Sequence, residues 1–268
     1  MRVRLLAVVL MVAGCADEAT PVEATSTSAP AATTGSWWVP PSGVTWQIQL
    51  LDRVDKAYDV AVYDVDLVDT DQATIDELHG AGRRVICYLS AGSYEDWRPD
   101  SGAYPDDVLG LALEGWPGEW WIDIRRLDAV GPILETRLDL AVAKGCDAVD
   151  PDNVDGYANP TGFDLTASDQ IAFNRWLADQ AHRRGLGVGL KNDLDQIPEL
   201  VPVFDFAVNE ECFAYEECDL LTPFIDAGKA VLAIDYSGNP SGCAAAEALG
   251  LSLLFKDLDL GAVSTACP

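Results

Sequence analysis

The chain has 268 residues, of which 44 are acidic, 17 are basic and 2 are histidine, giving a formal net charge of -27. Hydrophobic residues make up 49% of it, which excludes a disordered acidic tail and predicts one large folded core. The charge argues against nucleic acid and anionic lipid surfaces as partners, and the scarcity of histidine argues against a histidine triad or zinc site, which leaves proton transfer to carboxylates.

The first 14 residues have the features of an export signal. Two arginines precede a short apolar run at residues 5–13, which is too short to span a bilayer. The sequence that ends at Cys15 resembles a bacterial lipobox, which implies cleavage before Cys15 and lipid attachment to its sulfur; the alternative is an ordinary secretory signal cut elsewhere. We therefore expect an extracytoplasmic protein, anchored to the cell membrane by lipid, or secreted if the lipobox is not used.

Residues 15–36 are rich in alanine, threonine, serine and proline, a composition typical of a flexible tether. Within the remaining residues, 37–268, short apolar runs predict eight strands: 45–50, 59–65, 84–90, 146–152, 186–192, 204–210, 230–236 and 251–257. Amphipathic stretches between some of these runs predict helices at 71–82, 131–145 and 166–185, each of which ends at a glycine.

This alternation predicts an α/β fold with a parallel sheet covered by helices on both faces. Eight units in one domain predict a single (β/α)8 TIM barrel, and a doubly wound open sheet is the alternative. No glycine-rich nucleotide motif follows the first strands, so the sequence predicts no cofactor.

One predicted connection is far longer than a barrel requires. Residues 92–124 follow the third strand and carry four tryptophans, at positions 97, 116, 120 and 121. Long loops after barrel strands usually build the binding site. We therefore expect a Trp-rich loop beside the site; the alternative is a packed cap that binds nothing.

Six cysteines follow Cys15, and export makes disulfides plausible. Cys212 and Cys218 lie close together in a loop, so we predict that they pair. Cys243 and Cys267 are the second predicted pair, which would tie down the C-terminus. The two cysteines inside predicted strands are interpreted as buried thiols: Cys87 and Cys146.

Polar residues cluster at the carboxyl ends of seven consecutive predicted strands, and in a barrel these ends converge on one rim where active sites are built. Carboxylate pairs beside aromatic platforms suit the cleavage of glycosidic bonds, in which one carboxyl group protonates the leaving oxygen while the other is the nucleophile or activates water. The acidic segment 150–155 superficially resembles a calcium loop, but it lacks the spaced glycine and the bidentate glutamate, so we predict no metal site.

Five blocks of sequence resemble glycoside hydrolase family 114, the endo-α-1,4-polygalactosaminidase-like barrels: CYLSAGSYEDWRPD (87–100), GEWWIDI (118–124), GCDAVDPDNVDGY (145–157), GLGVGLKND (185–193) and FDFAVNEECFAYEEC (204–218). The resemblance runs from about Trp37 to the C-terminus. It implies hydrolysis of α-1,4-linked galactosamine polymer by two acidic residues of the rim. On this basis Asp152 is assigned as the nucleophile, with Asp150 as its close rival, and Glu210 as the acid/base.

Other residues of the rim and the long loop are predicted to bind the substrate: Asp64, Tyr88, Ser90, Glu95, Trp97, Asp150, Asn153, Asp155, Lys191, Asn192 and Tyr236. The implied substrate is a cationic amino-sugar polysaccharide, whose local concentration an acidic rim can raise. We expect a monomer, and the sequence leaves open whether the reaction retains or inverts the anomeric configuration. The alternatives are an inactive carbohydrate-binding barrel lipoprotein and a hydrolase of another glycan.

Overall fold

The computed structural model describes residues 36–238 and 242–267. The predicted signal, Cys15 and all but the last residue of the predicted tether lie outside these residues. Within them, no helix is both long enough and apolar enough to cross a membrane.

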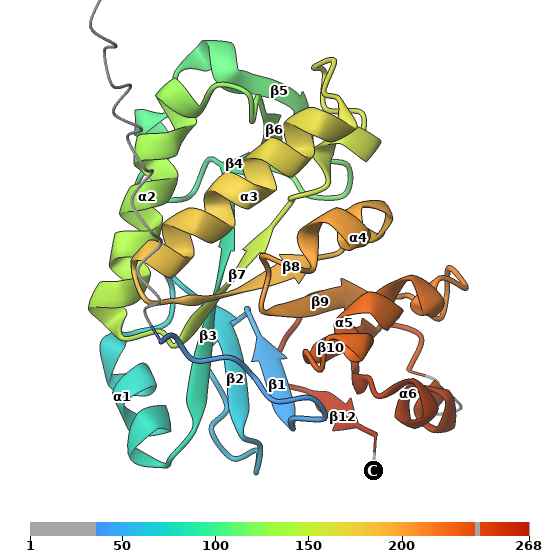
Figure 1. Cartoon of the computed structure of the whole chain (residues 1–268). Coiled ribbons are helices and arrows are strands. Elements are labelled where there is room, and N and C mark those ends of the chain that lie inside the picture. Colours follow the sequence, from blue (N-terminus) through green and yellow to red (C-terminus); the bar gives the residue numbers. More distant parts are fainter. Residues whose placement is uncertain (1–35, 239–241, 268) are drawn as a thin grey trace, which may run out of the picture. The chain divides into compact units, whose positions relative to one another are not determined.

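All eight predicted strands form, and they run parallel to one another in a single sheet (Figure 1). Their bounds are β1 (Trp46–Gln49), β2 (Val62–Asp66), β3 (Arg84–Ser90), β7 (Ala148–Asp152), β8 (Gly187–Lys191), β9 (Phe206–Glu210), β10 (Val231–Asp235) and β11 (Ser252–Lys256). A last short strand, β12 (Ser264–Ala266), pairs antiparallel with β11.

The sheet curls until its first strand approaches its eighth. Beyond the end of β1, the backbone N–H of Leu50 donates to the carbonyl of Leu260 at 3.0 Å. At the other end of β1, Trp46 Nε1 donates to the carbonyl of Ser252 at 2.9 Å. The result is a nearly closed (β/α)8 barrel, which confirms the TIM barrel prediction over an open sheet.

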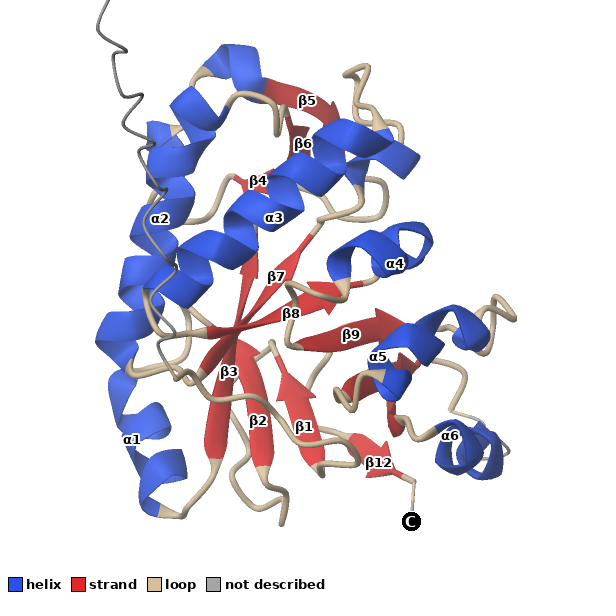
Figure 2. Ribbon diagram, viewed as in Figure 1, coloured by secondary structure: helices blue, strands red, loops and turns tan. Residues whose placement is uncertain are grey.

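Helices surround this barrel on the outside (Figure 2). The three predicted helices all form, and the structure adds three short ones; the bounds are α1 (Gln72–Gly80), α2 (Leu127–Lys144), α3 (Ala167–Arg183), α4 (Ile197–Leu200), α5 (Thr222–Asp226) and α6 (Cys243–Leu249). Single 3-10 turns occur at Ser101–Ala103, Asp106–Val108, Gly156–Ala158, Leu194–Gln196 and Cys218–Leu221. The start of α3 shows why the sequence predicts it, because Thr166 and Asp169 form a reciprocal capping box.

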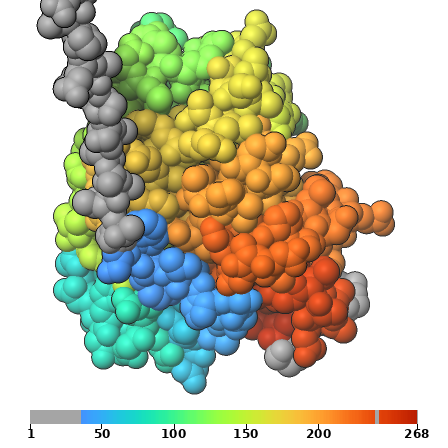
Figure 3. Space-filling model, viewed as in Figure 1, coloured from blue at the N-terminus to red at the C-terminus, as the bar shows by residue number. Residues whose placement is uncertain are grey.

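The amino-terminal end of the barrel is packed against the first described residues. Trp37 stacks on His182 with ring centroids 3.9 Å apart, and its Nε1 donates to Asp205 at 3.0 Å. In Figure 3 this segment, in blue, lies between the teal and orange parts of the surface. This packing leaves the opposite, carboxyl-terminal rim as the end where a ligand can enter.

Alternation along the strands sorts apolar and polar residues within the barrel. Inside it, near the amino ends of the strands, lie Ile48, Val62, Ile86 and Phe206, which belong to one buried cluster. Because successive side chains alternate between faces, the residues two and four positions further along each strand also face the interior. On β2 those positions carry Asp64 and Asp66, and on β3 they carry Tyr88 and Ser90, so these strands change from apolar to polar toward the rim.

The long Trp-rich connection is a folded unit. It contains a three-stranded antiparallel sheet in the order β4 (Ser93–Glu95), β6 (Glu119–Ile122), β5 (Leu109–Ala112). Its start is tied to β7, because the N–H groups of Ala91 and Gly92 donate to the carbonyl of Asp152 at 3.0 and 3.1 Å. A β-carbon at Gly92 would lie 1.7 Å from the carbonyl oxygen of Asn153, so this close approach requires glycine.

Three disulfides link the six cysteines that the structure describes. The predicted pairs Cys212–Cys218 and Cys243–Cys267 are confirmed. The interpretation of the other two as buried thiols is wrong, because Cys87 and Cys146 are bonded to each other. One lies on β3 and the other two residues before the neighbouring strand β7, a juxtaposition that only the strand order reveals.

Candidate active site

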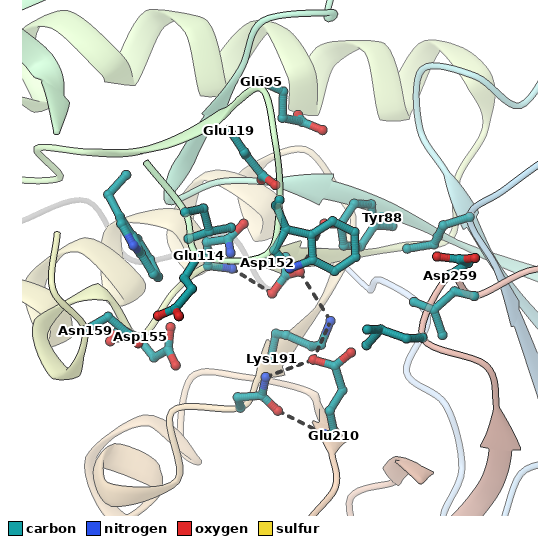
Figure 4. Close-up of a pocket in the computed structure, with 18 of the residues that line it drawn as sticks. Tyr88, Glu95, Glu114, Glu119, Asp152, Asp155, Asn159, Lys191, Glu210 and Asp259 are labelled. Atoms are coloured by element: carbon teal, nitrogen blue, oxygen red, sulfur yellow. Dashed lines mark hydrogen bonds and ion pairs between the residues drawn. The ribbon is translucent and has the colours of Figure 1, made fainter. Parts of the chain in front are cut away.

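A cavity of about 660 Å³ opens at the carboxyl ends of the strands, between the barrel rim and the long insertion (Figure 4). Both assigned catalytic carboxylates and most of the predicted substrate-binding residues line it: Tyr88, Glu95, Trp97, Asp152, Asn153, Asp155, Lys191, Asn192, Glu210 and Tyr236. A second hollow of about 430 Å³ adjoins it and shares Trp116, Asp155, Asn192, Glu210, Tyr236 and Leu258. Glu210 therefore lies between the two hollows.

Lys191 joins the two assigned carboxylates. Its Nζ lies 3.4 Å from Asp152 Oδ2 and 3.4 Å from Glu210 Oε2, and its side chain is almost completely buried. Burial alone would lower the pKa of Lys191, but the charges of Asp152, Glu210 and Asp150 outweigh burial and hold its pKa well above the usual range. The ammonium group therefore stays charged and holds both carboxylates on the same side of the cavity.

Asp152 is fixed by donors on both of its oxygens. Oδ1 accepts from the backbone N–H of Asn153 at 2.7 Å, and Oδ2 accepts from the hydroxyl of Tyr88 at 3.0 Å. Burial raises the pKa of Tyr88 well above its usual value, so its hydroxyl keeps its proton and remains a donor. This arrangement holds the carboxyl group of Asp152 in one orientation.

Glu210 has a similar set of donors, which follow the two strands on either side of β9. Asn192 Nδ2 donates to Oε2 at 3.1 Å, and the hydroxyl of Tyr236 donates to Oε1. The amide oxygen of Asn192 in turn accepts from the backbone N–H of Glu210 at 3.0 Å. The predicted rim residues Asn192 and Tyr236 thus orient the carboxyl group from two sides.

Left-handed backbone turns follow three of the strands that carry these groups. Asn153, Asn192 and Glu211 have φ values of 61°, 53° and 61°, which non-glycine residues adopt only at a cost. Each residue comes directly after a site residue that ends its strand. The turns break the strand geometry immediately beyond Asp152, Lys191 and Glu210, and Asn153 and Asn192 thereby enter the cavity wall.

Three of the predicted substrate-binding residues do not line the cavity. Asp64, Ser90 and Asp150 are all 0% exposed. Burial raises the pKa of Asp150 to about 7, and burial together with the charge of Asp150 raises that of Asp64 well above its usual range. Both aspartates lie in the barrel beneath the cavity floor and Ser90 behind its wall, so we assign them supporting roles.

Ser90 supports the position of Asn153. Its hydroxyl donates to Asn153 Oδ1 at 2.8 Å, and its carbonyl accepts from Arg137 Nη1 at 2.7 Å. Arg137 also binds Asp100 of the insertion through two contacts of 2.8 and 2.9 Å. The end of β3 is thereby coupled to the insertion through the buried side chain of Arg137 and the half-buried Asp100.

Arg98 neutralises the acidic side of the cavity next to β2. It donates to Asp66 at 2.6 and 3.0 Å and to Glu95 at 2.8 Å, with all three side chains buried. The predicted subsite residue Glu95 is therefore already paired with a cation. Arg98 and Arg137 were not predicted, because their roles depend on how the insertion folds back on the barrel.

Glu119 is a cavity residue that the sequence did not single out. It begins β6, is 6% exposed, and lines the same cavity as Asp152 (Figure 4). Its Oε1 accepts a hydrogen bond from Ser93. Burial raises its pKa to about 7, and the neighbouring charges of Glu95 and Asp152 add to this effect.

Aromatic and apolar side chains form the outer edge of the cavity. Trp97 and Trp116 are 52% and 46% exposed, and Leu111 and Leu258 are also exposed there. Exposed tryptophan faces in a cavity wall suit stacking against sugar rings. No group of three or more His, Cys, Asp or Glu side chains within residues 36–238 and 242–267 is placed to hold a metal ion.

Comparison with known proteins identifies the family of this chain and solved structures that it resembles. The model of glycoside hydrolase family GH114 matches residues 27–268. The crystal structure of Aspergillus fumigatus Ega3 in complex with galactosamine superposes with a TM-score of 0.83 at 42% identity, covering 87% of this chain and 99% of that chain. No curated protein matches this chain.

A second structure shares the fold at much lower identity. The glycoside hydrolase domain of PelA from Pseudomonas aeruginosa superposes with a TM-score of 0.69 at 15% identity, covering 85% of this chain and 99% of that chain. At this identity the likeness concerns the fold alone.

Proposed function

Because this chain belongs to glycoside hydrolase family GH114, we propose that it cleaves an α-1,4-linked, galactosamine-containing polysaccharide by a two-carboxylate mechanism. One observation carries this proposal: Asp152 and Glu210 face the same cavity and are bridged by the ammonium group of Lys191. The galactosamine bound to the similar Ega3 structure supports an amino sugar as the unit recognised.

The spacing of the two carboxylates supports a retaining reaction. The oxygens that contact Lys191 are each 3.4 Å from its nitrogen, so they lie no more than about 6.8 Å apart. Retaining glycosidases place the carboxyl groups about 5–5.5 Å apart, whereas inverting enzymes use about 6.5–9.5 Å to admit a water molecule. The bridge by a single ammonium group favours the shorter arrangement.

In the proposed reaction Asp152 attacks the anomeric carbon while Glu210 donates a proton to the departing glycosidic oxygen. This step forms an ester between the sugar and Asp152 and releases the remainder of the polymer. Glu210 then removes a proton from water, which attacks the same carbon and frees Asp152. Tyr88 and the backbone of Asn153 hold the attacking carboxylate, and Tyr236 and Asn192 orient the acid.

The adjoining hollows support cleavage within the polymer rather than only at its end. Glu210 and Tyr236 line both of them, so a chain can continue past the scissile bond in either direction. Trp97 in the first hollow and Trp116, which lines both, offer exposed ring faces to sugars on either side. The acidic lining suits a polymer of ammonium-bearing sugars.

We further propose that the enzyme is exported and attached to the outer face of the cell membrane through lipid on Cys15, and that it acts as a monomer. The lipobox-like sequence before Cys15 supports the anchor. The disulfides of the folded domain support an oxidising compartment.

The proposal is tested by Asp152→Asn and Glu210→Gln assayed for reducing ends released from partially deacetylated α-1,4-galactosaminan, with chitosan as the control polymer. Each change removes one of the two required carboxyl groups at nearly constant shape, so each should lower kcat by about 1,000-fold or more. Proton NMR of the first product should show the α-anomer. Wild-type turnover in either variant, or preferred cleavage of chitosan, contradicts the proposal.

A further inference from the structure

The carboxyl group of Glu119 faces the cavity from the insertion, on the opposite side from Glu210 of the barrel strand β9. In Figure 4 it lies between Glu95 and Asp152 and is directed toward Asp152. Ser93 occupies only one of its oxygens. Oε2 has no hydrogen-bond partner among the described residues, and it does not belong to the fully buried unpartnered atoms, so it is open to the cavity.

Several other carboxylates that line the cavity have cationic partners. Among the described residues, Glu114, Asp155 and Asp259 have none, but all three are more exposed than Glu119. Asp152 and Glu210 share Lys191, and Asp66 and Glu95 share Arg98. Within residues 36–238 and 242–267, no lysine, arginine or histidine nitrogen lies within 4.0 Å of Glu119. The cavity therefore contains a buried carboxyl group whose counter-ion the described protein does not supply.

Such a group lowers the stability of the ligand-free protein. A buried carboxylate without a partner loses hydration without regaining it, and the raised pKa of Glu119 expresses that cost. The groups that face it are Glu95 from β4, Asp152 from β7 and Arg98, and the two acids increase the cost. A cation that enters the cavity and contacts Oε2 would remove it.

The proposed substrate carries such a cation. Each deacetylated galactosamine unit bears an ammonium group, whereas an N-acetylated unit bears a neutral amide at the same carbon. A charged donor on a largely buried carboxylate gives a stronger hydrogen bond than a neutral amide does. A water-exposed carboxylate would discriminate much less, because solvent screens it.

We infer that Glu119 binds the ammonium group of a galactosamine unit and thereby sets the preference of this enzyme for deacetylated over N-acetylated polymer. The inference rests on the proposed function and adds to it the residue responsible for amine selectivity. Ser93 positions Glu119 for this contact, and the sheet β4–β6 places both residues over Asp152.

Binding separates this role from catalysis. The parent protein is the Glu210→Gln variant, which cannot protonate the leaving group, so oligomers of α-1,4-linked galactosamine and of N-acetylgalactosamine stay intact during titration. Calorimetry at about pH 7 then gives Kd values for both oligomers, with and without the additional change Glu119→Gln. Glutamine keeps the shape and the contact with Ser93 but cannot ionise.

Glu119→Gln should weaken binding of the galactosamine oligomer about 10- to 100-fold and change binding of the N-acetylated oligomer by less than about 2-fold. Asp106→Asn is the control, since it removes the same charge from an exposed position of the same insertion that does not line the cavity. Its effect on the ratio of the two Kd values should stay below about 2-fold, because water screens that charge.

Thermal unfolding at pH 8 completes the test, because removal of an unpaired buried carboxylate should leave the Tm of Glu119→Gln equal to or above that of its parent. An unchanged ratio of Kd values, or equal loss of both oligomers with a lower Tm, would show that Glu119 is only structural and would overturn the inference. If the parent binds neither oligomer, the proposed substrate itself is wrong. Turnover of galactosaminan by the wild type tests the proposed reaction separately.

Discussion

Asp150 and Asp152 lie two positions apart on β7 and face the same side of the strand, yet their surroundings differ completely. Asp152 reaches the cavity, and three donors contact its two oxygens: Tyr88, Lys191 and the backbone N–H of Asn153. Asp150 is one layer deeper, where its carboxyl group is completely buried beside that of Asp64. A difference of one layer thus separates a group that can touch substrate from one that cannot.

Asp150→Asn should therefore retain activity to within about 10-fold of the wild type, whereas Asp152→Asn should lose about 1,000-fold or more. The amide keeps the shape of Asp150, and Lys191 still has two carboxylates to bind. Steady-state kinetics on galactosaminan measures both effects. Loss of activity in Asp150→Asn as complete as in Asp152→Asn, with the fold intact, would make Asp150 the nucleophile.

Site residues could be predicted from the sequence where they lie at the carboxyl end of a predicted strand. Tyr88, Asp152, Lys191 and Glu210 could be placed on one rim because parallel strands end together. The depth of a residue within the barrel depends on register, so Asp64 and Asp150 could not be separated from the cavity residues in this way. Glu119 also escaped notice, because only the pairing of β4 with β6 brings it over Asp152.

At the scale of elements, ionic contacts join the insertion to α2, and a disulfide joins the two barrel strands between which the insertion lies. Arg137 of α2 holds Asp100 of the insertion, and Cys87 of β3 is bonded to Cys146 immediately before β7. The disulfide encloses 59 positions of sequence, which include all of the insertion and α2. It therefore restricts the unfolded chain more than the other two disulfides do.

Replacing both Cys87 and Cys146 with alanine should lower the free energy of unfolding by roughly 4 kcal/mol, since loop-closure entropy grows with the length enclosed. The matched change at Cys212 and Cys218, which lie six positions apart, should cost only roughly 2 kcal/mol. Denaturant unfolding of the two double variants compares them. A larger loss for the Cys212–Cys218 pair would contradict the entropic explanation.

Strand and helix positions followed closely from the sequence, since each apolar run is long enough to cross the sheet once and several helices end at glycine. The insertion was expected only as a loop. Its three strands have three or four residues each, and such short strands are stabilised by the barrel beneath them rather than by their own pattern.

Over the whole molecule, the carboxyl groups give stability a clear pH dependence. Burial is the main cause of raised pKa values at four sites, to about 6 at Asp155, about 7 at Asp150 and Glu119, and about 8 at Asp193. Their usual values lie near 4, so between pH 4 and 8 the unfolded chain ionises before the folded one. Stability from these groups is therefore complete below pH 4 and is lost as the pH rises toward 8.

Tm should consequently be higher at pH 5 than at pH 8, by about 5 °C or more. Below pH 4 the trend should reverse, because arginine contacts lower the pKa of Asp100 and Asp123, and those contacts weaken on protonation. Calorimetric scans measure Tm both below pH 4 and between pH 5 and pH 8. Asp193→Asn should reduce the fall in Tm between pH 5 and pH 8. A Tm that rises from pH 5 to pH 8 would show that the buried carboxyl groups do not control stability.

The bond between Cys87 and Cys146 has a consequence for what proteolysis does to the molecule. Every backbone position of the exposed edge formed by Leu111 and Trp116 lies inside the loop that this bond closes. A protease that cuts there would leave two fragments joined through sulfur, with the barrel strands that carry Asp152 and Glu210 still packed together. A molecule cut in this region would therefore keep both fragments together, so proteolysis there would not by itself separate the two halves of the active site.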